Sequence, residues 1–344
     1  MEIHQVLPRD AIPSVDDPEF ADDHEGTPDD DVVVVTEGGE ARAYPIRYLN
    51  YHEIVNDRVG GRPVAVTWCP LCGSAVVYDR RVGKADGAVI PPEGVPDDGV
   101  LTFGVSGKLA DDDLVMYDRE TESEWKQSLG EAIAGPLAGA ELAVRPAAVV
   151  PYRRFAADHP EGVVLAPPGG KSEAASDGDE PAPVEYDDEP YREYFDSAGF
   201  GLAAHRGGDG REWDRADLDP KEVVLGVERD GEALGFPHSR VEAAGGVVAA
   251  TVGGRRVAVF ATPDGIHAFA ADGLAFEPTD VPGQFRADGA RWDGATGESD
   301  DGRALDRVPA GRLFAFAWQD DHGPDAFYDP EGAQRSNPDR SSTS

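Results

Sequence analysis

The hydrophobic pattern of the chain consists mostly of short runs rich in Val, Tyr, Phe and Leu, bounded by Gly, Asp and Pro. Such runs predict β-strands, because β-branched and aromatic side chains suit a pleated surface. The expected strands cover residues 32–37, 41–46, 63–68, 75–78, 101–105 and 114–117. Helices are expected only at 47–55 and 152–158. The pattern therefore predicts a mainly β (β-rich α+β) protein of sandwich- or barrel-like units with few short helices.

Three blocks of sequence recur along the chain in the same order. Residues 32–45 resemble 223–237, residues 60–66 resemble 253–259, and residues 117–121 resemble 292–296. A shared order and approximate spacing predict two tandem duplicated domains.

Two acidic stretches rich in Gly and Pro, at 83–99 and 167–190, interrupt the strand pattern and predict surface loops or disorder. The second of them precedes the second repeat and is interpreted as a linker. The expected organisation is an N-terminal extension at 1–30, a first repeat at 31–166, an acidic linker with partial order at 167–216, a second repeat at 217–330 and a disordered tail at 331–344.

The charge balance restricts the partners and the setting. The chain has 67 Asp and Glu against 31 Lys and Arg, for a formal net charge of -36. Acidic residues spread over the whole chain are typical of a salt-loaded cytoplasm, as in haloarchaea, where salt screens their repulsion. Nucleic acid and anionic membranes are poor partners for such a surface. The N-terminus shows no secretory signal and no run reaches the ~20 apolar residues of a membrane helix, so a cytoplasmic location is expected.

Cys69 and Cys72 are the two cysteines of the chain, and they flank Pro70 and Leu71. Thiols in a cytoplasm are expected to be reduced at rest. An ungapped comparison of the repeats places Thr262 opposite Cys69 and Gly265 opposite Cys72, so the second repeat has neither sulfur. This difference indicates that the first repeat carries a site and the second is a scaffold.

Several motifs of the first repeat resemble the family called domain of unknown function 3179. They are Tyr44-Pro45, residues 52–57, residues 69–74, residues 103–107, residues 114–119 and Trp125. The resemblance extends from about residue 31 to residue 328. The family has no established activity. Some of its members resemble selenoproteins, which implies redox use of the cysteine motif.

The first interpretation of the two cysteines is thiol redox chemistry. One thiolate attacks an oxidised substrate, a small molecule or a protein thiol partner, and the other cysteine resolves the intermediate, without a cofactor. His52 or Arg119 is the candidate for lowering the pKa of the attacking thiol, which makes Cys69, Cys72, His52 and Arg119 the candidate catalytic residues. The motif lies between two strands, whereas a thioredoxin motif opens a helix, so a thioredoxin fold is disfavoured.

Two alternatives stay open. The spacing is that of a zinc knuckle, so Cys69, Cys72 and His52 are candidate ligands of Zn or Cu, with water or another side chain completing the shell. In the other alternative, both cysteines are buried small side chains of a structural or partner-binding protein.

The sequence also suggests roles for residues around these motifs. Asp118 and Thr121 recur as Asp293 and Thr296, which predicts a turn fixed by side-chain to backbone hydrogen bonds. Residues 111–113 are three consecutive aspartates and predict a solvated acidic turn. Residues 103–108 lack the glycine spacing of a P-loop, and Leu109 stands where a P-loop has Ser or Thr.

Overall fold

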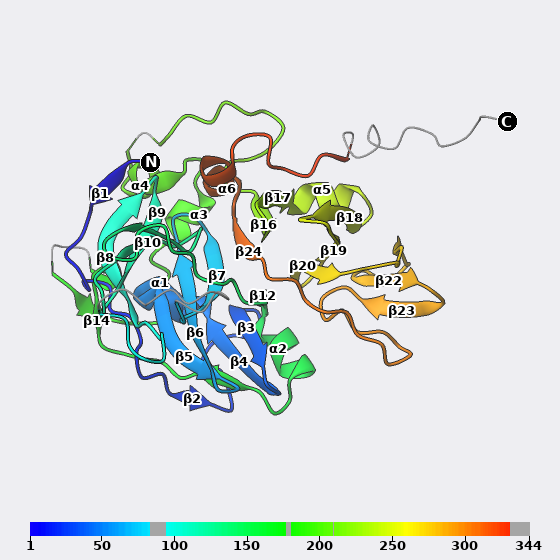
Figure 1. Cartoon of the computed structure of the whole chain (residues 1–344), viewed down its shortest axis with the longest axis horizontal. Coiled ribbons are helices and arrows are strands. Elements are labelled where there is room, and N and C mark those ends of the chain that lie inside the picture. The colour runs from blue at the N-terminus through cyan, green and yellow to red at the C-terminus, as the bar shows by residue number, and fades with distance from the viewer. Residues whose placement is uncertain (83–93, 177–179, 209, 331–344) are drawn as a thin grey trace.

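The computed structural model describes residues 1–82, 94–176, 180–208 and 210–330. Strands arranged in several sheets dominate it, and the helices are short, which confirms the mainly β fold class (Figure 1). The predicted tail at 331–344 and most of the predicted loop at 83–99 lie outside the described residues. No helix among the described residues is long and apolar enough to cross a membrane.

A six-stranded sheet forms the centre of the molecule (Figure 1). Its order is β17 (Glu232–Pro237), β16 (Val223–Arg229), β24 (Gly311–Phe314), β7 (Ser74–Asp79), β6 (Arg62–Cys69) and β5 (Ile54–Val59). β24 lies between strands of the two predicted repeats, and its Arg312 pairs with Ala75 of β7. The two predicted repeats therefore share one sheet.

A five-stranded sheet packs against the β5–β7 part of this central sheet. It contains β1 (Ile3–Gln5), β8 (Phe103–Ala110), β9 (Asp113–Asp118), β10 (Glu124–Lys126) and β11 (Glu131–Ala134). The largest hydrophobic core lies between the two sheets and includes both cysteines. In this core Phe103 and Trp125 meet edge to face, with ring centroids 5.7 Å apart. The cysteine motif thus lies at an interface between two sheets.

The remaining strands form four further sheets. They are β12 (Ala148–Pro151), β3 (Asp31–Glu37), β4 (Glu40–Pro45), β13 (Val163–Leu165) and β2 (Phe20–Ala21) in one sheet, β14 (Lys171–Ser172) and β15 (Ala182–Pro183) in the second, β18 (Val247–Val252), β19 (Arg255–Thr262) and β20 (Gly265–Ala270) in the third, and β21 (Glu277–Pro278), β22 (Gln284–Ala287) and β23 (Ala290–Asp293) in the fourth. The helices are α1 (Ile46–His52), α2 (Tyr152–Asp158), α3 (Arg192–Asp196), α4 (Gly201–His205), α5 (His238–Ala243), α6 (Ala315–His322) and the 3₁₀ turn η1 (Glu173–Ala175).

The two segments that the sequence predicted to be repeats have the same order of elements. Each contains a hairpin that ends in a proline, a short helix and three antiparallel strands: β3 to β7 with α1, and β16 to β20 with α5. Pro45 and Pro237 occupy the N-cap position of the two helices. The hairpins also have equal register, because Val32 pairs with Pro45 as Val224 pairs with Pro237. The duplication itself stays a prediction.

The segments predicted to be an extension and a linker are part of the packed structure. β1 pairs with β8 at the edge of the five-stranded sheet, and Val15 forms a bridge with Val55. In the predicted acidic linker, Tyr191, Tyr194 and Phe200 are buried in the core that holds the cysteines. Sequence composition did not indicate the burial of these aromatic side chains, because acidic residues dominate the composition of the segment around them.

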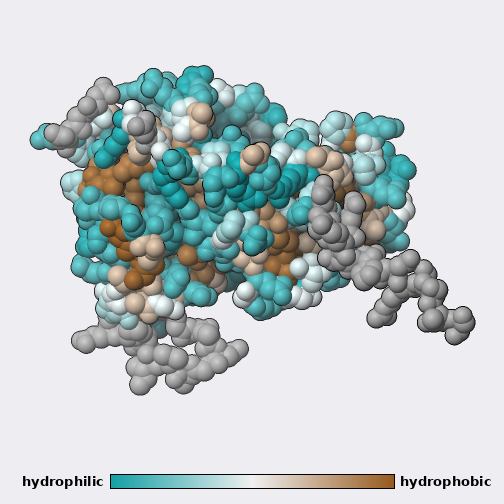
Figure 2. Space-filling view, turned by 90° about the horizontal axis from the view of Figure 1, so that it is seen from above, coloured by the Kyte–Doolittle hydropathy of each residue, from teal (hydrophilic) through white to brown (hydrophobic). Residues whose placement is uncertain are grey.

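The face of the molecule shown in Figure 2 is mostly hydrophilic. In Figure 2 hydrophobic residues are confined to small patches that hydrophilic residues surround. This agrees with the excess of Asp and Glu in the composition, because these side chains stay solvated.

Candidate functional site

Cys69 and Cys72 lie at the tip of the hairpin formed by β6 and β7. Cys69 is the last residue of β6 and pairs with Ser74, so the connecting turn contains the four residues 70–73. The matching hairpin of the second segment pairs Thr262 with Gly265 and has a turn of two residues. Strand register therefore places Gly265 opposite Ser74, whereas the ungapped comparison had placed it opposite Cys72. Cys72 belongs to a turn that is two residues longer than its counterpart.

Backbone carbonyl groups of this turn are fixed by residues far away in the sequence. The Tyr194 hydroxyl donates to Leu71 O at 2.6 Å, and the backbone N–H of Phe314 donates to Cys72 O at 2.8 Å. The guanidinium of Arg312 donates to Gly73 O at 2.9 Å. α3 and β24 thus hold the cysteine turn from two sides.

Gly73 is required for the close packing of the turn against β24. Its φ of +54° is unfavourable for other residues, and a Cβ atom there would lie 2.7 Å from the Phe314 ring. Gly73→Ala is expected to lower the free energy of unfolding by about 2–4 kcal/mol, measured by chemical denaturation. Gly61→Ala is the control, because Gly61 has φ +80° and nothing within 4 Å of its Cβ position. Equal losses in the two variants would contradict the contact with Phe314.

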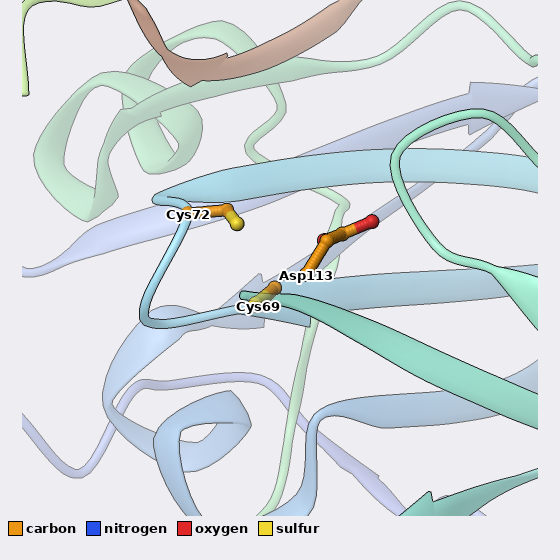
Figure 3. A group of neighbouring side chains, drawn as sticks. All are labelled: Cys69, Cys72 and Asp113. Carbon is orange, nitrogen blue, oxygen red and sulfur yellow. The ribbon is translucent and has the colours of Figure 1, made fainter. Parts of the chain in front are cut away.

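Asp113 completes a cluster of three ligand-type side chains (Figure 3). The two sulfur atoms and one carboxylate oxygen of Asp113 all lie within 4.8 Å of one another. Asp113 is the first residue of β9, so the cluster joins the tip of one sheet to the start of a strand in the other. All three side chains are buried; Cys69 and Asp113 are each 2% exposed.

The position of Asp113 corrects the solvated acidic turn predicted from the three aspartates. Asp111 and Asp112 have φ values of +52° and +67° and form the two-residue turn between β8 and β9. Positive φ at both positions is characteristic of a tight hairpin turn, in which Asp is well tolerated. Asp113 follows this turn as the first strand residue and its side chain is buried. Asp111 and Asp112 thus form the turn, and Asp113 lies beside the cysteines.

The surroundings favour the protonated forms of all three groups. Burial raises the pKa of Cys69, and the nearby carboxylates Asp113 and Glu53 act in the same direction, while hydrogen bonding from Cys72 partly opposes it. The pKa of Cys72 is raised further, by burial and by its interaction with Cys69. Burial also raises the pKa of Asp113 to about 6. A bound cation would stabilise the deprotonated forms of these three groups.

The hydrogen-bonding capacity of Asp113 is half used. Its Oδ2 accepts a hydrogen bond from the backbone N–H of Ser128 at 2.8 Å, whereas its Oδ1 is buried and has no partner. Ser74 Oγ and Gln127 Oε1 are also buried without a partner, although Gln127 Nε2 donates to Thr67 Oγ1. Unpartnered buried polar atoms are uncommon and costly, so their concentration near the cysteines favours a site for a ligand.

A buried ion pair lies next to this cluster. Lys126 Nζ contacts Asp321 Oδ1 of α6 and lies 3.7 Å from Asp111 Oδ2. Both Lys126 and Asp321 influence the pKa of Asp113, in opposite directions. Lys126 is therefore paired with Asp321, and its positive charge also favours the ionised form of Asp113.

Cys69 also lines a pocket of about 110 Å³ between the first segment and helix α4. Glu53, Tyr191 and His205 line the same pocket. The Glu53 carboxyl is buried, its Oε2 has no hydrogen-bond partner, and burial raises its pKa to about 8. Its backbone φ of +57° is strained for a residue other than glycine. One cysteine of the cluster is thus accessible from a small pocket that also holds a protonated carboxylic acid.

His52 lies away from the two sulfur atoms. It is the last residue of α1, and its ring nitrogens contact Pro13 O at 2.9 Å and the Tyr186 hydroxyl at 2.7 Å. Burial lowers its pKa, so the ring is neutral and supplies no charge to a thiolate. The structure therefore gives the third ligand-type position to Asp113, where the sequence suggested His52.

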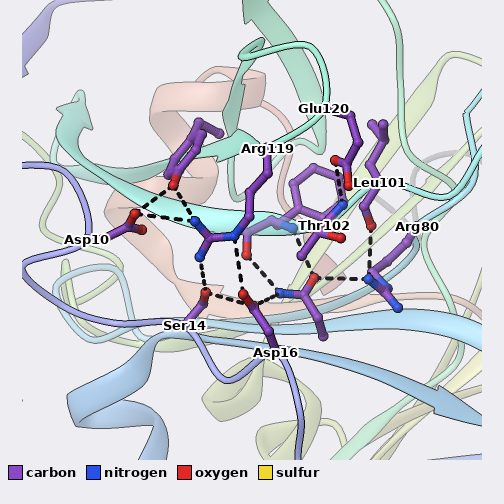
Figure 4. Close-up of polar contacts among 11 residues, drawn as sticks. Asp10, Ser14, Asp16, Arg80, Leu101, Thr102, Arg119 and Glu120 are labelled. Atoms are coloured by element: carbon purple, nitrogen blue, oxygen red, sulfur yellow. Dashed lines mark hydrogen bonds and ion pairs between the residues drawn. The ribbon is translucent and has the colours of Figure 1, made fainter. Parts of the chain in front are cut away.

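Arg119 is also separate from the cysteines. Its guanidinium binds Asp10, Ser14 and Asp16 of the N-terminal segment (Figure 4). The nearby Arg80 donates to Leu101 O at 3.0 Å (Figure 4). Neither arginine is among the main influences on the pKa of either cysteine. Both hold segments of the first half together.

The predicted turn at Asp118 is confirmed. The backbone N–H of Thr121 donates to Asp118 Oδ1, and that of Thr296 donates to Asp293 Oδ1 at 3.1 Å. Trp125 is a core residue, and its indole N–H donates to Asp118 Oδ2 at 2.9 Å.

Sequence reasoning missed Asp113, Glu53 and Lys126 as neighbours of the site. The signal for Asp113 was present, because three aspartates between two strand patterns exceed what a two-residue turn needs. Glu53 and Lys126 carried no comparable signal, since their burial depends on packing between distant segments.

Comparison with known proteins places this site in a family. No curated protein and no solved structure matches the chain. The model of one family, described as "Protein of unknown function (DUF3179)", matches residues 9–328. This range includes the cysteine turn, Asp113 and both segments with the matching order of elements. Because the match covers nearly the whole chain, the protein belongs to the DUF3179 family.

Proposed function

We propose that Cys69, Cys72 and Asp113 bind a metal ion and that this ion is Zn²⁺. The observation that supports this most is the convergence of two thiols and a half-satisfied buried carboxylate within 4.8 Å. Ligand atoms of a tetrahedral zinc site lie about 3.5–4 Å apart, as Zn–S distances of about 2.3 Å and Zn–O distances of about 2.0 Å require. Small side-chain movements bring the three groups to this spacing.

The donor set favours zinc over other metals. Two thiolates disfavour Ca²⁺ and Mg²⁺, which take oxygen ligands. A carboxylate is a poor ligand for Cu(I), which prefers sulfur. Zn²⁺ accepts both donor types, and the proposed ligand set resembles those of zinc sites that keep an open position.

Three protein ligands leave a fourth position for water or a substrate. Zinc in such a position would act as a Lewis acid and lower the pKa of a bound water molecule. The pocket beside Cys69 gives small molecules a route to this region, and the Glu53 carboxyl is placed to donate or accept a proton there. The proposed zinc site is therefore open to a small ligand.

Metal content and thiol reactivity test this proposal together. The purified chain is expected to contain about one zinc per chain by elemental analysis, and its two cysteines are expected to resist a thiol reagent until a chelator is added. Because 67 acidic side chains bind cations weakly, the matched control is the double variant Cys69→Ser/Cys72→Ser in the same buffer. Equal zinc in the wild type and the double variant would refute the proposal.

Thiol–disulfide exchange is the second candidate function. It is favoured by the closeness of the two sulfur atoms and by the pocket that reaches Cys69. Cys69 would attack a substrate disulfide, Cys72 would resolve the mixed disulfide, and the substrate would leave as two thiols while the protein retains an intramolecular disulfide.

The raised pKa values of both cysteines weaken this second candidate, because the thiolate is the attacking species. A metal-free protein that gains two titratable thiols on reduction would support exchange chemistry and contradict the zinc site.

A further inference from the structure

A second and larger cavity, of about 550 Å³, lies between the two segments. It is bounded by β3, β12 and β24, by helix α5 and by the turn between β19 and β20. Cys69, Cys72 and Asp113 do not line it. Its volume is in the range of small-molecule binding sites, which are apolar cavities with few convergent polar groups.

Arg312 supplies an unpaired positive charge to this cavity. Its Nη1 donates to Gly73 O, and its guanidinium lies over the Trp68 ring, 5.8 Å from the centroid. No carboxylate of the described residues forms an ion pair with it. Burial lowers its pKa, and the main opposing influence is Asp31. The remaining N–H groups of a fixed guanidinium are free for a carboxylate.

Asp31 supplies the matching negative charge. It is exposed and lines the same cavity, and within the described part of the chain its carboxylate has no hydrogen bond or ion pair. Arg312 and Asp31 influence each other's pKa, yet they are too far apart for an ion pair. The two opposite charges therefore line one cavity without forming an ion pair with each other.

The other charged groups of the cavity wall already have partners, and among them His238 Nδ1 lies 3.6 Å from Glu242 Oε2. Asp264 pairs with Arg153 at 3.1 Å, and Glu222 Oε1 accepts a hydrogen bond from the backbone N–H of Ser239 at 2.7 Å. Lys221 Nζ donates to the carbonyl groups of Tyr194 and Ser197. Arg312 and Asp31 are thus the charged groups best placed to receive a ligand.

The rest of the wall is largely aliphatic. Val33, Val149, Leu225, Ile266 and Ala310 line the cavity. Such a wall favours an aliphatic group on the ligand, because its burial removes apolar surface from water.

We propose that this cavity binds a small zwitterion with an aliphatic side chain, of the class of free α-amino acids. The ligand carboxylate binds Arg312, the ammonium group binds Asp31, and the side chain packs on the aliphatic wall. This site is independent of the zinc proposal, because it uses none of the three metal ligands.

Three matched probes test the proposal by calorimetric titration of the full chain. L-leucine carries both charges, N-acetyl-L-leucine lacks the ammonium group, and L-leucinamide lacks the carboxylate. L-leucine is expected to bind, and each of the other two is expected to bind at least about tenfold more weakly, since each leaves one charge of the cavity unpaired. Failure of L-leucine to bind, or equal binding of L-leucinamide, would overturn the proposal.

Two variants assign the charges. Asp31→Asn is expected to weaken L-leucine binding about tenfold and to abolish the preference for L-leucine over N-acetyl-L-leucine. Arg312→Gln is expected to abolish binding of L-leucine. This substitution also removes the hydrogen bond to Gly73 O in the cysteine turn and can prevent folding. Asp31→Asn does not affect that turn, so it tests the proposal even if Arg312→Gln does not fold. Asp29→Asn, a surface aspartate near Asp31, is the control. Unchanged binding in Asp31→Asn would refute the assignment.

Discussion

Replacing Asp113 by asparagine is expected to lower the affinity for Zn²⁺ by more than about 100-fold. Changes to groups that only support a ligand typically cost about 10–100-fold, and Asp113 is proposed to contact the metal directly. The asparagine carbonyl can still accept the hydrogen bond from Ser128, so the metal-free variant should fold as the wild type does. Competition with a chromophoric zinc chelator measures the affinity, and circular dichroism measures the fold.

Asp111→Asn is the matched control for this prediction. Asp111 belongs to the same three aspartates, but it lies in the turn and its φ is +52°. Its replacement should leave zinc affinity within about threefold of the wild type. Equal losses of affinity in the two variants would show that the charge of the aspartate cluster matters and direct ligation by Asp113 does not.

Replacing Glu53 by glutamine is expected to stabilise the protein near neutral pH. The pKa of Glu53 is raised from 4.5 to about 8 by burial, so the folded chain binds more protons than the unfolded chain between these values. The contribution of Glu53 to the free energy of unfolding is therefore fully present below the pKa of the unfolded chain. It decreases as the pH rises toward about 8. At about pH 7 the variant should gain roughly 3 kcal/mol, because each pKa unit corresponds to about 1.4 kcal/mol.

Urea unfolding of the metal-free protein at several pH values measures this effect. The free energy of unfolding of the wild type relative to Glu53→Gln should decrease between about pH 5 and pH 8. Glu161→Gln changes an exposed carboxyl and should leave the pH dependence unchanged. A Glu53→Gln curve parallel to that of the wild type would contradict the protonated, buried carboxyl.

The strands of the first half could be predicted from sequence because each is a short apolar run between turn residues. The predicted helix at 152–158 matches α2, which follows Pro151 at its N-cap. The helix predicted at 47–55 ends at His52 in the structure, because Glu53 adopts a positive φ and the chain enters β5 at Ile54. Residues 54 and 55 are apolar in either conformation, so periodicity did not distinguish helix from strand.

The candidate site could be located from sequence but not completed. Two cysteines close together in a chain without others identified the turn. The third member required knowledge of the turn geometry at Asp111 and Asp112, which decides that Asp113 faces inward. The shared sheet across β24 and the burial of Tyr191 and Tyr194 depend on packing between segments more than 100 residues apart, which no local pattern encodes.

X-ray absorption spectroscopy at the zinc edge of the metal-loaded protein identifies the atoms bound to the metal. The spectrum is expected to show two sulfur atoms at about 2.3 Å and two oxygen atoms at about 2.0 Å from the metal, one from Asp113 and one from water or a ligand. Asp113→Asn is expected to bind less zinc, so the signal from the two sulfur atoms should be weaker or absent. A spectrum with no sulfur shell, or with four sulfur atoms, would contradict a zinc site formed by Cys69, Cys72 and Asp113.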